Sequence, residues 1–264
     1  MYDNRPIGVF DSGVGGLTVL SEIKKLLPRE SFVYFADQAN NPYGGRKVTE
    51  IRKLAFRVVN FLVKKDVKLI IVACNTVSVN AISYIRSKFN VPIIAVVPVV
   101  KKLADETKTG KVAVFSTPAT AKSRYLKDLI KKYAKNVYVY RVGTSKLEHL
   151  VEQGIVSGQA VIDAIESSLL PLIDKKVDCI ALGCTHYPFL IPEIKKVVGS
   201  KVKIYDSGGA IARQVVRVLE KEGLLSSDKG HDIFYTSGNA QVFKEISGKL
   251  LGGKPVDVEK VDSI

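Results

Sequence analysis

The sequence contains little sulfur and no tryptophan: its 264 residues include three cysteines and one methionine. Three is an odd number and the cysteines are widely spaced, which favours reduced thiols over a disulfide framework. With 46% hydrophobic and 25% charged residues, a chain of this length can bury one large core or two ordinary ones. These numbers indicate a globular protein and exclude a small disulfide-rich one.

Long hydrophobic runs are also missing. No apolar run approaches the roughly 20 residues that a membrane-spanning helix requires. The opening residues lack the charged-then-apolar layout of a signal peptide. We therefore expect a cytoplasmic protein that has no membrane partner.

Negative charge is in the minority, since the formal net charge is +14. Such an excess of basic residues can indicate a nucleic-acid partner. The lysines, however, are scattered as Lys-Lys pairs on expected helix faces, and no basic block is interleaved with aromatic residues. Solvated helix surfaces explain this pattern more simply, so we expect no nucleic-acid partner. The positive field would instead steer an anionic substrate toward the protein.

Two ten-residue segments, residues 67–76 and 177–186, are near copies of each other. Each is an apolar run that ends in a small residue, a cysteine and two polar residues, so Cys74 and Cys184 hold equivalent places. A second pair of similar segments, residues 7–12 and 112–117, opens the two halves of the chain. The repeat predicts one thiol from each half facing a single ligand. That arrangement suits chemistry on both faces of one atom.

Short β-rich runs alternate with stretches whose apolar residues recur at helical spacing. The expected strands are residues 7–10, 32–35, 69–73, 93–97, 112–115, 137–140, 179–182 and 202–205. The expected helices are residues 17–27, 48–63, 77–89, 121–133 and 191–198, with two more within 145–173. This alternation predicts mainly parallel sheets with helices on both faces.

The repeat and the alternation together predict an α/β protein of two pseudo-symmetric lobes, each a mainly parallel sheet flanked by helices. We assign residues 1–96 plus 207–264 to the first lobe and residues 97–206 to the second. In open α/β sheets, ligands bind beyond the carboxyl ends of the strands. The active site is therefore expected between the lobes, where the polar motifs follow the strands.

The glycine-rich segment 11–16 follows the first expected strand and precedes a helix. Its glycines allow the backbone to approach a ligand and to point N–H groups at an anion, although a tight strand–helix turn explains them equally well. The spacing is not that of a dinucleotide-binding fingerprint. Asp11 is the more informative residue, because an acid at a strand end can set the protonation of a neighbouring thiol.

Cys74 and Cys184 are each expected to end a strand and to begin a helix. That position is expected to lower the pKa of a thiol through the helix dipole and free N–H groups. A single cysteine is more often a small buried hydrophobic residue, but two at equivalent repeat positions favour a function. Cys179 lies five residues before Cys184 in the same strand. It therefore points to the opposite face, and we interpret it as a core residue.

A zinc site is the main chemical alternative for these thiols. Cys179, Cys184 and His186 are not at a usual zinc-ligand spacing, and two of them point to opposite faces of the strand. We therefore expect no metal. His186 is instead placed to protonate or orient the thiol two residues before it.

Several other polar residues occupy expected loops or helix starts. Pro42-Tyr43-Gly44 lies in the loop after the second strand, where ligand-contacting turns occur. Asn75, Thr76 and Thr185 carry short polar groups at expected helix starts, where N-capping explains them without excluding binding of a carboxylate. Glu152, on pattern alone, is a solvated acid at the end of a helix.

These motifs together resemble those of the glutamate racemases, a cofactor-independent family of the aspartate/glutamate racemase superfamily. The resemblance runs from Ile7 to about Gly238. It is carried by the phrases VFDSGVGGLTV (9–19), PYG (42–44), ACNT (73–76), LGCTHYP (182–188) and DSG (206–208). Each phrase is modest alone, but their number and order make the match specific.

The resemblance implies that Cys74 and Cys184 exchange the Cα proton of glutamate as a paired acid and base. It further implies that Asp11 assists Cys74. His186, together with Glu152, is implied to assist Cys184. The residues implied to bind the amino acid are Asp11, Ser12, Tyr43, Gly44, Asn75, Thr76, Thr185 and His186. No cofactor is implied.

The family relationship also implies a biological setting. The enzyme would supply D-glutamate for peptidoglycan, and so contribute to cell-wall biogenesis and cell shape, often as a homodimer. The sequence departs from the family at Ala119 and Ala121, where Gly and Val are usual, which makes Thr117 and Thr120 less secure ligand contacts. The usual Cys-Pro shortly before Glu152 is absent too, so the role of Glu152 rests on the Leu-Val-Glu-x-Gly pattern (150–154) alone.

Three alternatives remain open from the residues. The nearest is a two-thiol racemase that acts on aspartate. The second is a two-lobed binding module for an acidic ligand, which would not need paired cysteines. The third is a nucleic-acid binder, which only the net charge favours.

Overall fold

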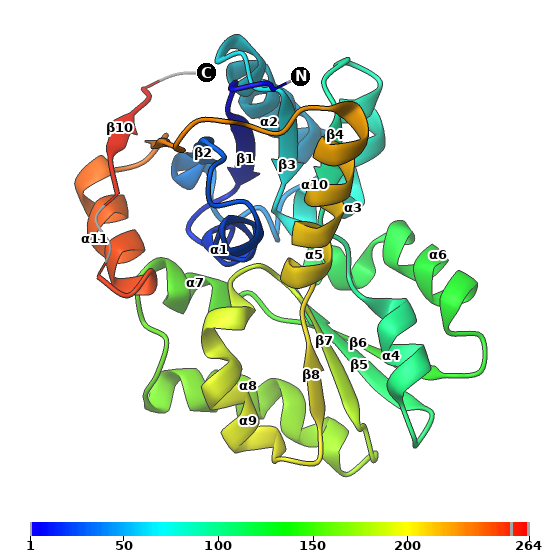
Figure 1. Cartoon of the computed structure of the whole chain (residues 1–264). Helices are drawn as coiled ribbons and strands as arrows, with labels where there is room; N and C mark the ends of the chain where they lie inside the picture. Colours follow the sequence, from blue (N-terminus) through cyan, green and yellow to red (C-terminus); the bar gives the residue numbers. More distant parts are fainter. Residues whose placement is uncertain (1, 254–255, 263–264) are drawn as a thin grey trace.

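Two parallel β-sheets form the framework of the chain, whose computed structural model describes residues 2–253 and 256–262 (Figure 1). The larger sheet contains β1 (Ile7–Asp11), β2 (Phe32–Ala36), β3 (Leu69–Val72), β4 (Ile93–Ala95), β9 (Asp232–Thr236) and β10 (Val258–Lys260). The smaller sheet contains β5 (Lys111–Ser116), β6 (Tyr138–Gly143), β7 (Cys179–Gly183) and β8 (Lys203–Tyr205). All strand pairs within both described sheets are parallel.

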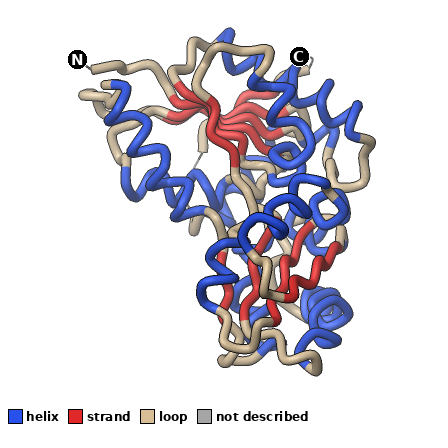
Figure 2. Tube along the Cα trace, turned by 90° about the vertical axis from the view of Figure 1, so that its right-hand side faces the viewer, coloured by secondary structure: helices blue, strands red, loops and turns tan. Residues whose placement is uncertain are grey.

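The two sheets share one strand order, which is the structural counterpart of the sequence repeat. The larger sheet runs β10-β9-β2-β1-β3-β4, and the smaller runs β6-β5-β7-β8. The segment β2-β1-β3-β4 thus matches the whole of the smaller sheet strand for strand. The predicted α/β class with two helix-flanked parallel sheets is confirmed (Figure 2).

Helices cover both sheets. They are α1 (Leu17–Leu26), α2 (Val48–Lys64), α3 (Asn75–Arg86), α4 (Val100–Glu106), α5 (Pro118–Lys122), α6 (Arg124–Tyr133), α7 (Lys146–Glu152), α8 (Gln159–Ile173), α9 (Ile191–Val198), α10 (Gly208–Glu222) and α11 (Ala240–Leu250). Two 3-10 helices, η1 (Gln38–Asn40) and η2 (Tyr187–Leu190), follow β2 and β7. None of the helices in the described ranges is long and apolar enough to cross a membrane.

The helix expected over residues 121–133 is in fact two helices. Thr117 begins α5 by accepting a hydrogen bond from the Thr120 N–H, with Pro118 in the first turn. Ser123 has extended backbone and accepts from the Leu126 N–H, so it ends one helix and begins the next. The single-helix prediction was wrong because the apolar spacing continues across a serine that caps better than it extends a helix.

The chain after residue 207 packs against the larger sheet. Helix α10 packs on α1, and β9 pairs with β2. The division of the chain into lobes at 96/97 and 206/207 stays a prediction, although β4 and β8 each lie on the expected side of those positions.

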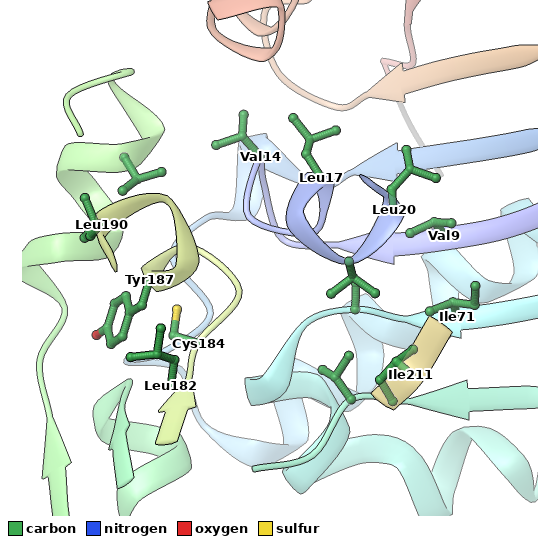
Figure 3. Packing of buried hydrophobic residues seen from close by; sticks show 14 of the residues in the cluster. Val9, Val14, Leu17, Leu20, Ile71, Leu182, Cys184, Tyr187, Leu190 and Ile211 are labelled. Atoms are coloured by element: carbon green, nitrogen blue, oxygen red, sulfur yellow. The ribbon is translucent and has the colours of Figure 1, made fainter. Parts of the chain in front are cut away.

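One buried apolar cluster spans the junction between the sheets. Val14 and Leu17, at the start of α1, belong to the same cluster as Leu182, Tyr187 and Leu190 around the end of β7 (Figure 3). Because these groups are buried on both sides, the strand ends between them are shielded from water.

A buried ion pair holds the amino end of the larger sheet. Lys68 Nζ lies 2.6 Å from Glu30 Oε2, and the two side chains are 0% and 2% exposed. The same ammonium group donates to the Asp3 carbonyl, while Glu30 Oε1 accepts from the Ser226 N–H. The pair therefore joins the starts of β2 and β3 to the segment before β9.

Replacing Lys68 with methionine is expected to lower the free energy of unfolding by about 3–5 kcal/mol, because it leaves the Glu30 carboxylate buried without its counterion. Urea titration followed by circular dichroism measures the loss. Lys102→Met, which removes an exposed pair with Glu106, is the matched control and is expected to change the midpoint little. Equal losses in the two variants would contradict the assignment.

Candidate active site

Asp11 ends β1 and connects the two sheets. Its side chain is fully buried. Oδ1 accepts a hydrogen bond of 2.9 Å from the Gly13 N–H, and Oδ2 accepts one of 3.0 Å from Thr185 Oγ1. Thr185 follows β7, so the carboxyl ends of the two sheets face each other at this bond. Burial raises the pKa of Asp11 to about 6, with His186 and the hydrogen bonds opposing the rise.

Cys74 follows β3 and occupies the N-cap position of α3, as the sequence predicts. It is 5% exposed, and its Sγ lies 3.7 Å from Ser12 Oγ. The expected lowering of its pKa is contradicted: burial, reinforced by the charge of Asp11, raises the pKa of Cys74 well above that of a free thiol. The Val77 N–H and Ser12 act in the expected direction but are weaker than desolvation.

Cys184 follows β7 but does not begin an α-helix, so that expectation was wrong. A turn and the 3-10 helix η2 come next, with Pro188 in the first turn of η2, and α9 begins only at Ile191. The thiol is 4% exposed, and burial raises its pKa too. Its principal polar partner is His186, whose Nδ1 lies 3.6 Å from Sγ and acts to lower the pKa.

His186 and Glu152 form a buried pair beside Cys184. Nε2 of His186 lies 2.6 Å from Glu152 Oε1. Burial opposes a charged imidazole, but the bonds to Cys184 and Glu152 raise the pKa of His186 well above its usual value. Burial likewise acts against the Glu152 carboxylate, but its hydrogen bonds hold the pKa of Glu152 below the usual value. The pair is therefore ionic at neutral pH.

Glu152 is not the solvated helix-end acid that its sequence pattern indicates. Its side chain is 12% exposed. Oε1 also accepts a hydrogen bond of 2.8 Å from the Val14 N–H, and Oε2 accepts one of 3.0 Å from Gln38 Nε2. The end of α7 is thus docked against the turn after β1, a contact that no local pattern reveals.

The threonines of the two sheets meet in a hydroxyl chain. Thr76 Oγ1 lies 2.9 Å from Thr117 Oγ1, which donates in turn to Thr120 Oγ1 over 3.1 Å. All three residues are buried. The amide nitrogen of the neighbouring Asn75 side chain is buried as well, and no described residue accepts a hydrogen bond from it. This corner therefore holds an unused donor beside a set of hydroxyl groups.

The loop of Tyr43 and Gly44 touches the second sheet. The Tyr43 hydroxyl donates a hydrogen bond to Asp37, and the Tyr43 carbonyl accepts one from the Arg46 N–H. The Gly44 carbonyl accepts from the Ala119 N–H over 3.1 Å. A Cβ at Gly44 would lie 3.0 Å from Thr117 Cβ, so glycine permits this close approach.

Two site residues were missed by the sequence reasoning. Gln38 contacts Glu152 from just beyond the end of β2, and the rule that ligand groups follow strand ends would have pointed to it. Glu148 lies one turn before Glu152 on α7 and is 3% exposed. The sequence offers no signal for its burial, because a glutamate on a polar helix normally faces water.

The junction between the sheets is closed in this structure. The cavity beside Cys184, which Asn75 and Thr185 also line, has a volume of about 10 Å³. That space is barely enough for one water molecule and is too small for an amino acid.

Cys179 lies apart from this site, as predicted. It packs with Val112 and Ala181 on one face of the smaller sheet, whereas Cys184 belongs to the cluster on the other face. Among residues 2–253 and 256–262, no group of three His, Cys, Asp or Glu side chains is arranged to hold a metal ion.

Gly13 is a position at which any side chain would collide with Glu152. A Cβ there would lie 1.9 Å from Glu152 Oε1. Gly13→Ala is therefore expected to displace Glu152 from Val14 and to cost about 1–3 kcal/mol of stability, measured by denaturant unfolding. Gly45→Ala, where a Cβ would meet nothing within 4 Å, is the control. Full stability of the Gly13 variant would show that the turn has room to shift.

Comparison with known proteins gives one family. The family model described as Asp/Glu/Hydantoin racemase matches residues 7–215. A curated glutamate racemase of Clostridium botulinum is 38% identical over 251 residues, which is 94% of this chain and 97% of that protein.

Solved structures agree with the sequence matches. A glutamate racemase of Bacillus anthracis superposes with a TM-score of 0.88 at 34% identity, covering 98% of both chains. The glutamate racemase of Francisella tularensis, solved in complex with D-glutamate, gives a TM-score of 0.87 at 33% identity and covers 98% of both chains.

Proposed function

The chain belongs to the Asp/Glu/Hydantoin racemase family and is an amino-acid racemase, and we propose that it interconverts L-glutamate and D-glutamate by proton exchange at Cα between two thiols. The observation that carries the proposal is the placement of Cys74 and Cys184. Both are buried and follow equivalent strands of two facing sheets, with a different polar partner for each.

Racemisation needs a base on one face of Cα and an acid on the other, because one residue cannot easily reach both faces. In one direction Cys74 acts as the thiolate base and Cys184 as the thiol acid, and the roles reverse for the other enantiomer. Burial raises the pKa values of both thiols. Each therefore needs a helper that takes its proton when the substrate is bound.

The helpers differ between the two faces. Asp11, whose pKa is raised to about 6, is ionised at neutral pH and serves as proton acceptor for Cys74. The charged His186, held by Glu152, favours the thiolate of Cys184 and returns a proton to it. The duplicated scaffold thus presents unlike assistants to the two mirror-image substrates.

The substrate is held by donors around this pair. We assign binding to the side chains of Ser12, Asn75, Thr76, Thr185 and His186, and to the backbone of Tyr43 and Gly44. Thr117 and Thr120 contribute through the hydroxyl chain to Thr76. The unpartnered Asn75 amide supports this assignment, because a buried donor without a partner is costly until a ligand carboxylate accepts from it. Closure of the lobes then excludes water from the acidified Cα–H.

The same proposal includes the cellular role. The product D-glutamate would enter peptidoglycan synthesis, and so cell-wall biogenesis and cell shape, in the cytoplasm. The enzyme would act as a homodimer, without a cofactor. The family resemblance supports each of these points.

Solvent-deuterium exchange tests the proposal directly. Purified protein in deuterium oxide, without added pyridoxal phosphate or metal, is expected to exchange the Cα proton of both glutamate enantiomers and to interconvert them. L- and D-aspartate are measured in parallel. Exchange of aspartate alone would replace the proposed substrate, and binding of glutamate without exchange would indicate a binding module.

A further inference from the structure

Glu148 is a buried acid with no partner in the described part of the chain. Its residue is 3% exposed, and no described group donates a hydrogen bond to Oε2. Burying a carboxyl oxygen without a hydrogen-bond partner is unfavourable, so such an atom usually has a ligand to meet. The mechanism of proton exchange described above does not use this group.

The surroundings of Glu148 place it inside the site. A Cβ on Gly44 would lie 3.4 Å from its Oε2, and Thr117 packs against the same point. Its charge acts on both Cys74 and Cys184. Among the described residues, no hydrogen bond joins it to either thiol, so its partner belongs to a part of the ligand away from Cα.

The charged groups around Glu148 determine whether its protonated or its ionised form is compatible with a dicarboxylate ligand. Three charged groups act on the pKa of Glu148: Asp11 at the end of β1, Glu152 on the same helix, and His186 in the segment after β7. The charge of Glu148 in turn raises the pKa values of Cys74, Cys184 and Tyr187. His186 is the only basic group among them, and Glu152 already neutralises it. Burial raises the pKa of Glu148 to about 7; His186 opposes the rise, and Asp11 and Glu152 add to it. The acid is therefore largely neutral below pH 7.

We propose that the protonated Glu148 carboxyl donates a hydrogen bond to the side-chain carboxylate of glutamate and that its ionised form repels this carboxylate, an inference that rests on the proposed racemase function. Asp11 is hydrogen-bonded to the Gly13 N–H and to Thr185, the residue that follows Cys184, whereas Glu148 Oε2 lies beside Gly44 and Thr117. Glu148 is therefore assigned to the side-chain end of the substrate, away from Cα. The residue thus determines specificity and makes glutamate binding dependent on pH.

The test measures glutamate affinity by calorimetry in a Cys74→Ala, Cys184→Ala background, which removes the titration of the thiols. If only the protonated acid binds, affinity falls by about 30-fold between pH 6 and pH 8.5 for a group whose pKa is about 7. Adding Glu148→Gln, which donates but does not ionise, is expected to reduce that fall to less than about threefold. Adding Glu148→Leu is expected to flatten the profile as well, with weaker binding at pH 6.

Glu193→Gln is the matched control, because Glu193 is 5% exposed and also has an unpartnered Oε2, but lies on α9 with its other oxygen bonded to Lys196. It is expected to keep the parental pH dependence. A steep profile that persists in both Glu148 variants would overturn the inference, as would a Glu148→Gln variant that binds more than tenfold weaker at every pH, which indicates an ammonium partner. If the unmodified protein neither racemises nor binds glutamate, the proposed function fails instead.

Discussion

Replacing Cys74 with alanine is expected to lower kcat for glutamate racemisation by about 10⁴-fold in both directions, and replacing Cys184 is expected to do the same. Each variant keeps one thiol and therefore one face of Cα. The remaining thiolate can remove a proton and return one from solvent, but only to the face it came from. Racemisation stops while isotope exchange continues in a single enantiomer.

The two variants should therefore exchange opposite enantiomers. Cys74→Ala and Cys184→Ala are incubated with each glutamate enantiomer in deuterium oxide, and Cα deuteration is followed by NMR alongside optical rotation. Cys179→Ala is the control, because that thiol is buried on the other face of the smaller sheet, and it is expected to retain racemase activity. Substantial racemisation by either single variant, or exchange of the same enantiomer by both, would remove the two-thiol scheme.

The equivalence of the two thiols could be recognised from sequence because it rests on local signals. Apolar runs with β-forming residues predicted β3 and β7, and the repeated small residue before each cysteine placed both thiols just beyond those strands. The shared order β2-β1-β3-β4 and β6-β5-β7-β8 follows from that repeat. Strand ends are therefore the part of the site that a sequence predicts well.

The ionisation of the thiols could not be predicted in this way. The helix start at Cys74 favours the thiolate, but the pKa depends on how completely the surrounding chain buries the sulfur, which is a tertiary property. At Cys184 the helix itself is absent, since Pro188 lies in a 3-10 turn that comes before α9. The directions of both shifts are set by packing between segments distant in sequence.

The hydrogen bonds of Glu152 could not be predicted from local sequence patterns either. Its three partners come from the turn after β1, from the start of η1 and from the segment after β7. Periodicity describes only the faces of α7 itself. The contact with His186 was anticipated through the family resemblance alone, and the role of the pair in the reaction stays a prediction.

Changing Glu152 to glutamine is expected to lower kcat by about 100-fold or more, because His186 loses the carboxylate that keeps it charged. The expected sign of the pH effect follows from the directions of the shifts. Glu152 raises the pKa of His186, so its removal lets the imidazole lose its proton at a lower pH. The alkaline limb of the rate profile should therefore move toward lower pH.

Initial rates in both directions over a range of pH, together with exchange at Cα, measure this effect. Because His186 contacts Cys184 and not Cys74, exchange on the face served by Cys184 should be impaired more than exchange on the other face. Gln38→Ala, which removes one hydrogen bond to Glu152 but leaves the ion pair, is expected to cause a much smaller loss with little movement of the limb. A profile that does not move in Glu152→Gln, or equal impairment of the two faces, would show that the pair merely supports the fold. Asymmetric impairment would mean that each thiol depends on its own assistant, which is how a duplicated scaffold can serve two substrates of opposite hand.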